Sequence, residues 1–154
     1  MVLISQTGKI FSLSSENRRL AIEATALLFF ARMAVIFLPF RWIAKTLGEK
    51  DVPKGEIDNT SKSNDLELNR IGWTIRRISD HTPWKSNCLA QAITAQKMLA
   101  SRNRSSKMFF GLKRGDEGKM EAHAWLKSGD TILTGGSGLE PYAVVAVFKK
   151  DVVL

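Results

Sequence analysis

The chain has 154 residues, of which 44% are hydrophobic and 25% charged, enough for one domain of ordinary size. Its single cysteine, Cys88, excludes an internal disulfide and a zinc site built from several thiolates. The 23 Lys and Arg residues outnumber the 15 Asp and Glu residues, and the net charge of +8 favours acidic partners without identifying them. The first residues do not resemble a secretory signal peptide, so we expect a cytoplasmic protein in a reducing environment.

Two helices are predicted near the N-terminus. Ser14 and Ser15 can cap a helix that continues to about Leu38, where Pro39 breaks or kinks it. A second, short helix is predicted over residues 40–47.

The segment from Leu20 to Phe40 is very apolar, but Glu23 and Arg32 divide it into runs far shorter than the roughly 20 residues that span a bilayer. We therefore expect a buried or peripheral helix. Contact with the inner face of the membrane stays open as an alternative, because aromatic and basic residues cluster where this helix ends: Phe37, Phe40, Arg41, Trp42 and Lys45.

Composition divides the chain into three regions. Residues 1–48 are expected to form an apolar helical region. Residues 49–64 are mostly charged or small and include Pro53 and Gly55, which is typical of a solvated linker. Residues 65–154 are expected to form the core domain.

The core region is predicted to contain helices first and strands second. Residues 65–79 carry apolar side chains at helical spacing, and residues 88–101 are rich in alanine, so both are predicted helices. After a polar break the apolar period changes to about two. Strands are predicted at four places: 107–113, 121–127, 131–134 and 142–149. Helices followed by an antiparallel meander make an α+β fold.

Cys88 lies in the first turn of its predicted helix, with Ser86 or Asn87 as the cap. Unpaired N–H groups and the helix dipole stabilise a thiolate at this position, and the backbone N–H of Cys88 can stabilise an oxyanion. His123 lies downstream on a predicted strand, and a Cys–His pair is what nucleophilic cysteine hydrolases require. On spacing alone, a buried structural thiol and an ordinary hydrogen-bonded histidine are the competing interpretation.

Two blocks of the sequence resemble a known family. They are residues 83–92 (PWKSNCLAQA) and residues 122–126 (AHAWL), followed by Gly135-Gly136. Both are similar to the leader peptidases of lasso-peptide biosynthesis, called B2 proteins, which belong to the transglutaminase-like, papain-related cysteine hydrolases. The resemblance implies a transglutaminase-like core, in which the catalytic Cys lies at a helix N-terminus packed on an antiparallel sheet that carries the His.

This resemblance implies a cysteine peptidase that removes the leader from a ribosomally made precursor peptide, with Cys88 as the nucleophile and His123 as the general base and acid. It implies a separate leader-recognition protein (B1, PqqD-like), because the chain has no room for a fused recognition domain. It also implies a cyclase related to asparagine synthetase. From the residues themselves we expect no cofactor or metal bound directly to this chain, and the nucleotide requirement of the coupled system stays open.

The third catalytic position departs from related enzymes, which place an Asp or Asn on the strand after the His strand. A tight hairpin over residues 127–131 would pair His123 with Thr134 or with Gly136, according to which two residues form the turn. Neither is a carboxylate, and Asp130 lies at the turn itself, too far away. Thr134, a backbone carbonyl or a side chain from elsewhere is left to orient the imidazole, and a Cys–His dyad is chemically sufficient.

Other residues are expected to contribute to binding. Candidates for the wall of a substrate groove are Trp84, Gln91, Trp125 and Thr134. The alternative is a core position for the two tryptophans and a solvated helix position for Gln91. A basic set is expected to bind an acidic peptide or to form a solvated face: Lys97, Arg102, Arg104, Lys107, Lys113, Arg114 and Lys119.

Two other functions stand beside leader cleavage. The same dyad could transfer the acyl group to an amine instead of to water. A non-catalytic basic module that binds nucleic acid or protein is the second alternative, but the sequence has no zinc finger, helix-turn-helix or aromatic RNA-binding motif, and we expect no nucleic-acid partner.

Overall fold

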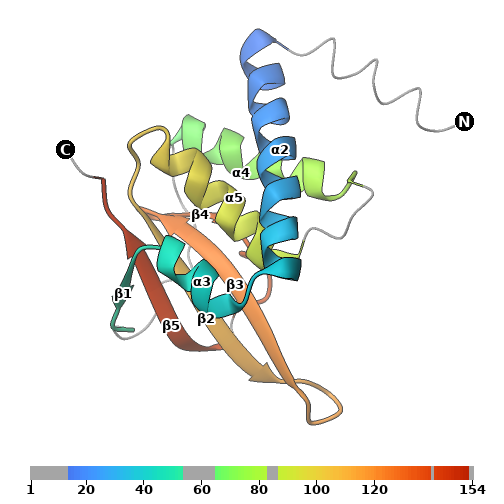
Figure 1. The fold of residues 1–154 in the computed structure, drawn as a ribbon, viewed down its shortest axis with the longest axis vertical. Helices are drawn as coiled ribbons and strands as arrows, with labels where there is room; N and C mark the ends of the chain where they lie inside the picture. Colours follow the sequence, from blue (N-terminus) through green and yellow to red (C-terminus); the bar gives the residue numbers. More distant parts are fainter. Residues whose placement is uncertain (1–13, 54–64, 83–86, 140, 153–154) are drawn as a thin grey trace, which may run out of the picture.

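The computed structural model describes residues 14–53, 65–82, 87–139 and 141–152. Helices come first in chain order and most of the sheet follows, which is the α+β arrangement predicted from the sequence (Figure 1). The elements are α2 (Ser15–Phe37), α3 (Phe40–Thr46), β1 (Glu49–Asp51), α4 (Leu66–Ser79), α5 (Cys88–Ala100), β2 (Ser106–Arg114), β3 (Met120–Ser128), β4 (Thr131–Thr134) and β5 (Ala143–Lys150).

The helix ends follow the capping residues of the sequence. The side chain of Ser14 accepts a hydrogen bond from Asn17 N at the start of α2, and Asp65 accepts two backbone N–H bonds at the start of α4. Pro39 separates α2 from α3, as predicted.

The sheet has the order β1-β5-β2-β3-β4, and every neighbouring pair is antiparallel. The predicted meander is therefore correct for β2, β3 and β4 but wrong for β5, which pairs with β2 instead of β4. Strand β2 carries three consecutive apolar residues, Met108, Phe109 and Phe110, that point to both faces. A strand of this kind is best buried in the middle of a sheet, and β5 covers its second edge.

The first residues of the predicted linker form a strand. Its first three residues, Glu49 to Asp51, form β1 and pair with Lys149 to Val147 of β5. Gly48 precedes this strand with a φ of +111°, and a Cβ at this position would overlap the carbonyl of Lys149. Residues 54–64, the rest of the predicted linker, lie outside the described residues.

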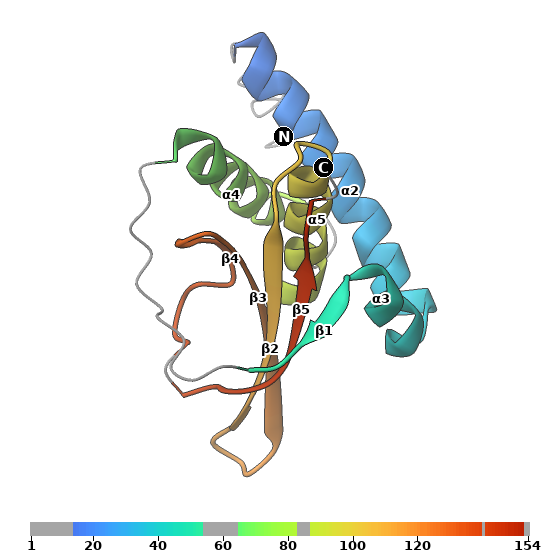
Figure 2. The same cartoon turned by 90° about the vertical axis from the view of Figure 1, so that its left-hand side faces the viewer.

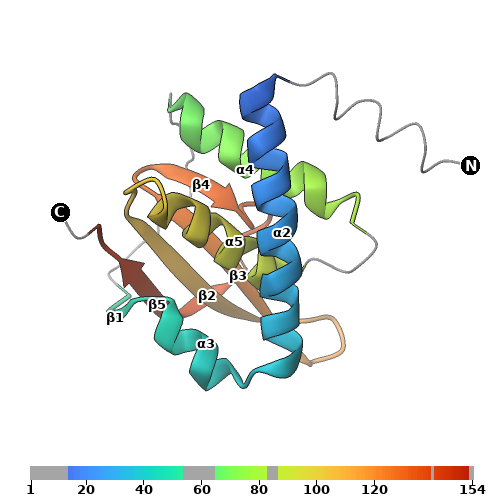
Figure 3. The same cartoon turned by 45° about the horizontal axis from the view of Figure 1, so that its top comes forward.

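The helices are stacked in layers on one face of the sheet. Helix α5 packs directly on β2, β3 and β4, and α4 packs beside it on β4. Helix α2 crosses outside α5 and α4, and α3 follows at its end (Figures 2 and 3). The N-terminal helical region is thus packed on the core domain.

Two hydrophobic clusters lie on the two faces of the sheet. The helix-side core joins the buried residues of the helices to those strand residues that face them, among them Met108, Ala124, Leu126, Leu133 and Phe148. The outer cluster lies on the opposite face, because successive strand residues point to opposite faces. It consists of Phe109, Trp125, Leu139 and Val147, with Ile132, Tyr142 and Val144 packed against them.

Candidate active site

Cys88 is the first residue of α5, as predicted. The side chain of Asn87 caps the helix by accepting a hydrogen bond from Ala90 N at 2.9 Å. The N–H groups of Cys88 and Leu89 have no acceptor within the helix, since the first turn lacks the preceding carbonyls. The free thiol is half-buried. The start of α5 therefore combines a sulfur nucleophile with two backbone donors that suit an oxyanion.

His123 lies on β3, half-buried beside two aromatic rings. Its ring centroid is 6.0 Å from that of Trp125 and 5.2 Å from that of Tyr142. Its Nε2 lies 2.8 Å from the carbonyl oxygen of Gly135. Because a carbonyl oxygen only accepts, Nε2 carries the proton and donates it. In the neutral ring, Nδ1 then holds the lone pair that a general base needs.

The backbone around Gly135 explains how a carbonyl reaches the ring. The β3–β4 turn is formed by Gly129 and Asp130, since Ser128 pairs with Thr131. The register then shifts at Leu126, which opposes Thr134, and β4 ends there. His123 consequently has no partner in β4, and the chain turns at Gly135, which has a φ of +72°.

A backbone carbonyl thus orients the imidazole, which is one of the alternatives left by the sequence. Asp130 lies exposed in the turn, and no bond joins it to His123 in the described residues. Thr134 is not the orienting group either, because its Oγ1 is buried without a hydrogen-bond partner there.

Cys88 and His123 lie on elements that pack together, α5 and β3. Their side chains nevertheless contact different clusters: Cys88 packs against the helix-side core, whereas His123 lies beside Trp125 and Tyr142 on the outer face. Within the described part of the chain, no hydrogen bond joins the thiol to the imidazole. Strand β3 pairs with β4 only over Leu126 to Ser128, so its edge at His123 is left unpaired by β4.

The predicted groove residues have different environments. Trp125 and Thr134 are each 1% exposed, so they are core residues and do not line an open groove. Trp125 stacks on Phe109 with ring centroids 5.6 Å apart, which explains its burial. Gln91 is half-buried on α5. Trp84 lies outside the described residues.

Tyr142 was not anticipated from the sequence. It packs against the outer cluster, lies beside the His123 ring, and has Lys113 Nζ 5.0 Å above its ring centroid. A hydrogen bond to Glu121 raises the pKa of Lys113 above its ordinary value. A lone tyrosine after Pro141, at the start of a strand, was the available signal. Tyr142 therefore lies next to the imidazole on the outer face of the sheet.

Most of the predicted basic set is already paired. The ion pairs join Arg102 to Glu23 and Glu67, Arg104 to Asp65 and Glu67, Lys107 to Asp51, Lys113 to Glu121, and Lys119 to Glu117. These local partners leave little free charge for an acidic ligand along this surface.

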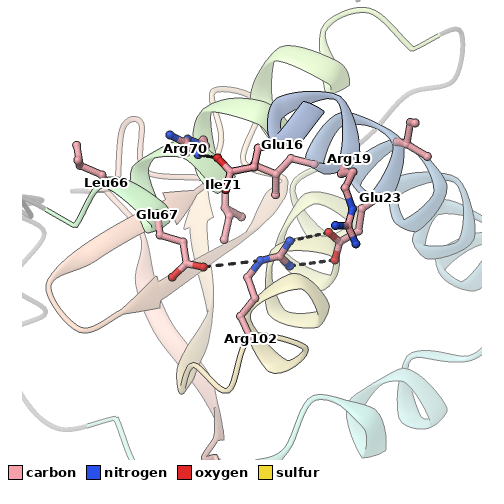
Figure 4. A pocket seen from close by; sticks show the side chains of 10 residues that line it. Glu16, Arg19, Glu23, Leu66, Glu67, Arg70, Ile71 and Arg102 are labelled. Carbon is pink, nitrogen blue, oxygen red and sulfur yellow. Dashed lines mark hydrogen bonds and ion pairs between the residues drawn. The ribbon is translucent and has the colours of Figure 1, made fainter. Parts of the chain in front are cut away.

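A pocket of about 850 Å³ lies elsewhere, between the N-terminal halves of α2 and α4 (Figure 4). Arg102 crosses it from the end of α5 to Glu23 at 2.7 Å, and Arg70 reaches Glu16 at 3.0 Å. Neither Cys88 nor His123 lines it. The described residues also contain no cluster of three His, Cys, Asp or Glu side chains that could hold a metal ion.

Comparison with protein families assigns most of the chain to one superfamily. Residues 34–147 match the Transglutaminase-like superfamily, whose members are generally cysteine peptidases or transferases. Searches of curated proteins and of solved structures gave no significant match. Since the family match covers well over half of the chain and includes both Cys88 and His123, the protein belongs to the Transglutaminase-like superfamily.

Proposed function

We propose that this protein is a cysteine peptidase that cleaves the leader from a lasso precursor peptide. The observation that carries the chemistry is a thiol on the first residue of α5, packed over the strand that holds an oriented histidine. Superfamily membership supports a thiol-dependent acyl chemistry. The lasso substrate rests on the resemblance of the two sequence blocks around Cys88 and His123.

In this proposal the thiol and the imidazole meet at the edge of β3 that β4 leaves unpaired. Nδ1 of His123 takes the proton of Cys88, and the thiolate attacks the carbonyl carbon of the scissile peptide. The N–H groups of Cys88 and Leu89 stabilise the oxyanion. The imidazolium then protonates the leaving amine, and the peptide C–N bond breaks to give a thioester. Water, deprotonated by the same imidazole, hydrolyses the thioester and restores the thiol.

The carbonyl of Gly135 performs the orienting role in this scheme. It holds Nε2–H and thereby keeps the lone pair on Nδ1, as the third member of a catalytic triad does. A carbonyl carries no full charge, so it stabilises the imidazolium less than a carboxylate would. A thiolate forms more readily than an alkoxide, so the dyad needs less help than a serine enzyme.

The proposed reaction requires partners. The precursor peptide is the substrate, a separate leader-recognition protein of the PqqD-like kind delivers it, and an asparagine-synthetase-like cyclase consumes the freed core peptide. The site proposed here uses only side chains and backbone groups of this chain.

The test is to incubate a candidate precursor with the recognition protein and this chain, and to detect leader and core by mass spectrometry. Wild type should release both, whereas Cys88→Ala and His123→Ala should leave the precursor intact. Cys88→Ser is the matched control, because it replaces the thiol with a hydroxyl of similar shape; it should also leave the precursor uncut, since a hydroxyl ionises far less readily than a thiol. Full cleavage by Cys88→Ala would contradict the proposal.

Acyl transfer to an amine is the second candidate, because the superfamily also includes transferases. The two reactions share the thioester and differ only in the acceptor. Adding a primary amine such as methylamine to the assay distinguishes them. Hydrolysis yields a leader that ends in a free carboxylate. Transfer yields a leader that ends in an N-methyl amide, and its mass differs from that of the hydrolysed leader accordingly.

A further inference from the structure

Helix α2 presents a second set of large apolar side chains, on a side of the helix different from the one packed in the helix-side core. Its inner face, with Leu20, Ala24, Leu28 and Ala31, is buried in the helix-side core. On other sides of the same helix, large apolar side chains are exposed: Ile22, Phe30, Ile36 and Phe37. Phe37 is 75% exposed. Scattered exposed apolar residues are normal, but a continuous stripe marks an interaction surface.

The short helix α3 extends this surface. Phe40 and Trp42 are exposed, and Trp42 reaches 59%. Helices α2 and α3 lie together on the side of the molecule opposite to β4 (Figure 2). We call the exposed residues of these two helices the α2–α3 face. It is an aromatic surface on the outer helical layer, and Phe40 at its edge also contacts Phe110 of β2, with ring centroids 5.4 Å apart.

Charge around the α2–α3 face is basic and unpaired. Arg18, Arg19, Arg32, Arg41 and Lys45 form no ion pair within the described residues. The two acidic residues of α2 are engaged elsewhere, Glu16 by Arg70 and Glu23 by Arg102. No Asp or Glu occurs from residue 24 to residue 48. This contrasts with the basic set after α5, most of which has local acidic partners.

We propose that the α2–α3 face docks on an anionic phospholipid bilayer. Aromatic and aliphatic side chains would enter the boundary between headgroups and acyl chains, and the unpaired Arg and Lys side chains would contact lipid phosphates. This inference does not depend on the peptidase proposal. An anionic bilayer would contact both the exposed apolar side chains and the basic side chains that have no ion pair.

The helix lies on the membrane in this arrangement and does not cross it. By length and composition alone, α2 could span a bilayer. Spanning would require Leu20, Ala24 and Leu28 to leave the helix-side core, in which they are almost fully buried. Docking through the outer face keeps that packing. A helix that is apolar on two opposite sides can serve both the core and the membrane surface.

The test is flotation of the full chain with lipid vesicles. The protein should float with vesicles of phosphatidylcholine and phosphatidylglycerol at low salt, and at least about tenfold less with phosphatidylcholine alone. High salt should weaken binding, because it screens the contacts with lipid phosphates. Absence of flotation, or equal flotation with neutral vesicles, would overturn the proposal.

Two exposed tryptophans supply a matched pair of variants. Trp42 on α3 and Trp73 on α4 are 59% and 58% exposed, and only Trp42 belongs to the α2–α3 face. Trp42→Ser should reduce flotation several-fold, and Trp73→Ser should leave it unchanged. Equal effects of the two substitutions would overturn the assignment to this face.

Two double variants separate the apolar and the charged contributions. Phe30→Ser/Phe37→Ser should abolish flotation, and Arg41→Glu/Lys45→Glu should remove its preference for anionic lipid. Circular dichroism should show that both remain folded, because all four side chains are exposed. Sedimentation without lipid should show a monomer. An oligomer that Phe30→Ser/Phe37→Ser dissociates would overturn the proposal, by showing that a second copy covers the face.

Discussion

The two faces of the sheet differ in the side chains that pack against them. The face that receives the helices joins α2, α3, α4 and α5 in one large core. The opposite face carries a small cluster around Trp125, and His123 lies at its margin. Cys88 contacts the first cluster and His123 the second. The large core is therefore on one face, and the ring contacts of His123 are on the other.

The proposed site depends on β3, because this strand contributes side chains to both faces of the sheet. One strand supplies Ala124 and Leu126 to the helix-side core and His123 and Trp125 to the outer face. Substitutions on β3 and at its neighbours can thus separate folding from chemistry. The predictions below use this separation, in order of decreasing expected effect.

Loss of the thiol should have the largest effect on activity. Cys88→Ala should reduce precursor cleavage by at least about 10⁴-fold, because the nucleophile and its thioester are lost. The melting temperature should change little, since Cys88 is only half-buried. Single-turnover cleavage and calorimetry measure the two quantities. A large loss of stability with retained cleavage would instead identify a structural thiol.

Loss of the imidazole should have the next largest effect. His123→Gln should reduce cleavage by about 10²–10⁴-fold, because no general base or acid is left. Its amide can still donate to Gly135 O, so the outer face should remain folded. Cleavage rates and near-ultraviolet circular dichroism measure these effects. Unchanged rates would remove His123 from the mechanism.

Displacement of the Gly135 carbonyl should reduce the cleavage rate less than loss of the thiol or of the imidazole. Gly135 has a φ of +72°, and a Cβ there would lie 2.5 Å from the carbonyl oxygen of Ala124. Gly135→Ala should therefore move the carbonyl and reduce cleavage by roughly 10–100-fold. Gly129→Ala is the matched control, because Gly129 also has a positive φ but open space around it. Equal losses in both variants would show that backbone strain alone is responsible.

Adjacent residues on β3 should separate the two faces. Leu126→Ala should lower the free energy of unfolding by about 2–5 kcal/mol and leave the rate of the folded enzyme nearly unchanged. Trp125→Ala should lower the free energy by about 3–5 kcal/mol and also reduce the rate, because its ring stacks beside His123. Denaturant unfolding and cleavage at low temperature measure both. Equal cleavage rates in Leu126→Ala and Trp125→Ala would contradict the assignment of stability and activity to different faces of the sheet.

The smallest expected effect concerns the acid stability of α4. Backbone hydrogen bonds from Leu68, followed by the charge of Arg104, hold the pKa of Asp65 below its ordinary 3.8. The carboxylate therefore stabilises the fold above that value, and the contribution is lost as pH falls through the lowered pKa. Asp65→Asn keeps a capping side chain and removes the charge.

Melting temperatures of wild type and Asp65→Asn should therefore differ by a few degrees near neutral pH and converge in strong acid. Cleavage at neutral pH should be equal. A difference that grows on acidification would reverse the sign of the assigned contribution.

Local features of the fold were predictable from the sequence. Ser14, Asp65, Asn87 and Pro39 mark helix boundaries through chemistry that acts over a few residues, and the strands follow the change of apolar period. The pairing of β5 with β2 was not predictable in this way. It depends on which edge is free after the whole sheet has assembled, and no local pattern contains that information.

The candidate site was also only partly predictable from the sequence. Cys88 and His123 were identifiable because a helix cap and small neighbours precede or flank them. The carbonyl of Gly135 was not, because a backbone group has no side-chain signature and its position depends on the register shift at Leu126. Burial of Thr134 follows from the same shift. Residue types thus indicated the two proposed catalytic residues, and tertiary geometry determined which group contacts the imidazole.

The most direct test of the central claim measures alkylation of Cys88 by iodoacetamide as a function of pH in wild type and His123→Gln. If the two residues form a pair, wild type should react at about pH 6 at least tenfold faster than free cysteine. His123→Gln should lose this excess at low pH and approach the profile of an ordinary thiol. Identical profiles for the two proteins would contradict the account, because they would show that the imidazole never reaches the sulfur.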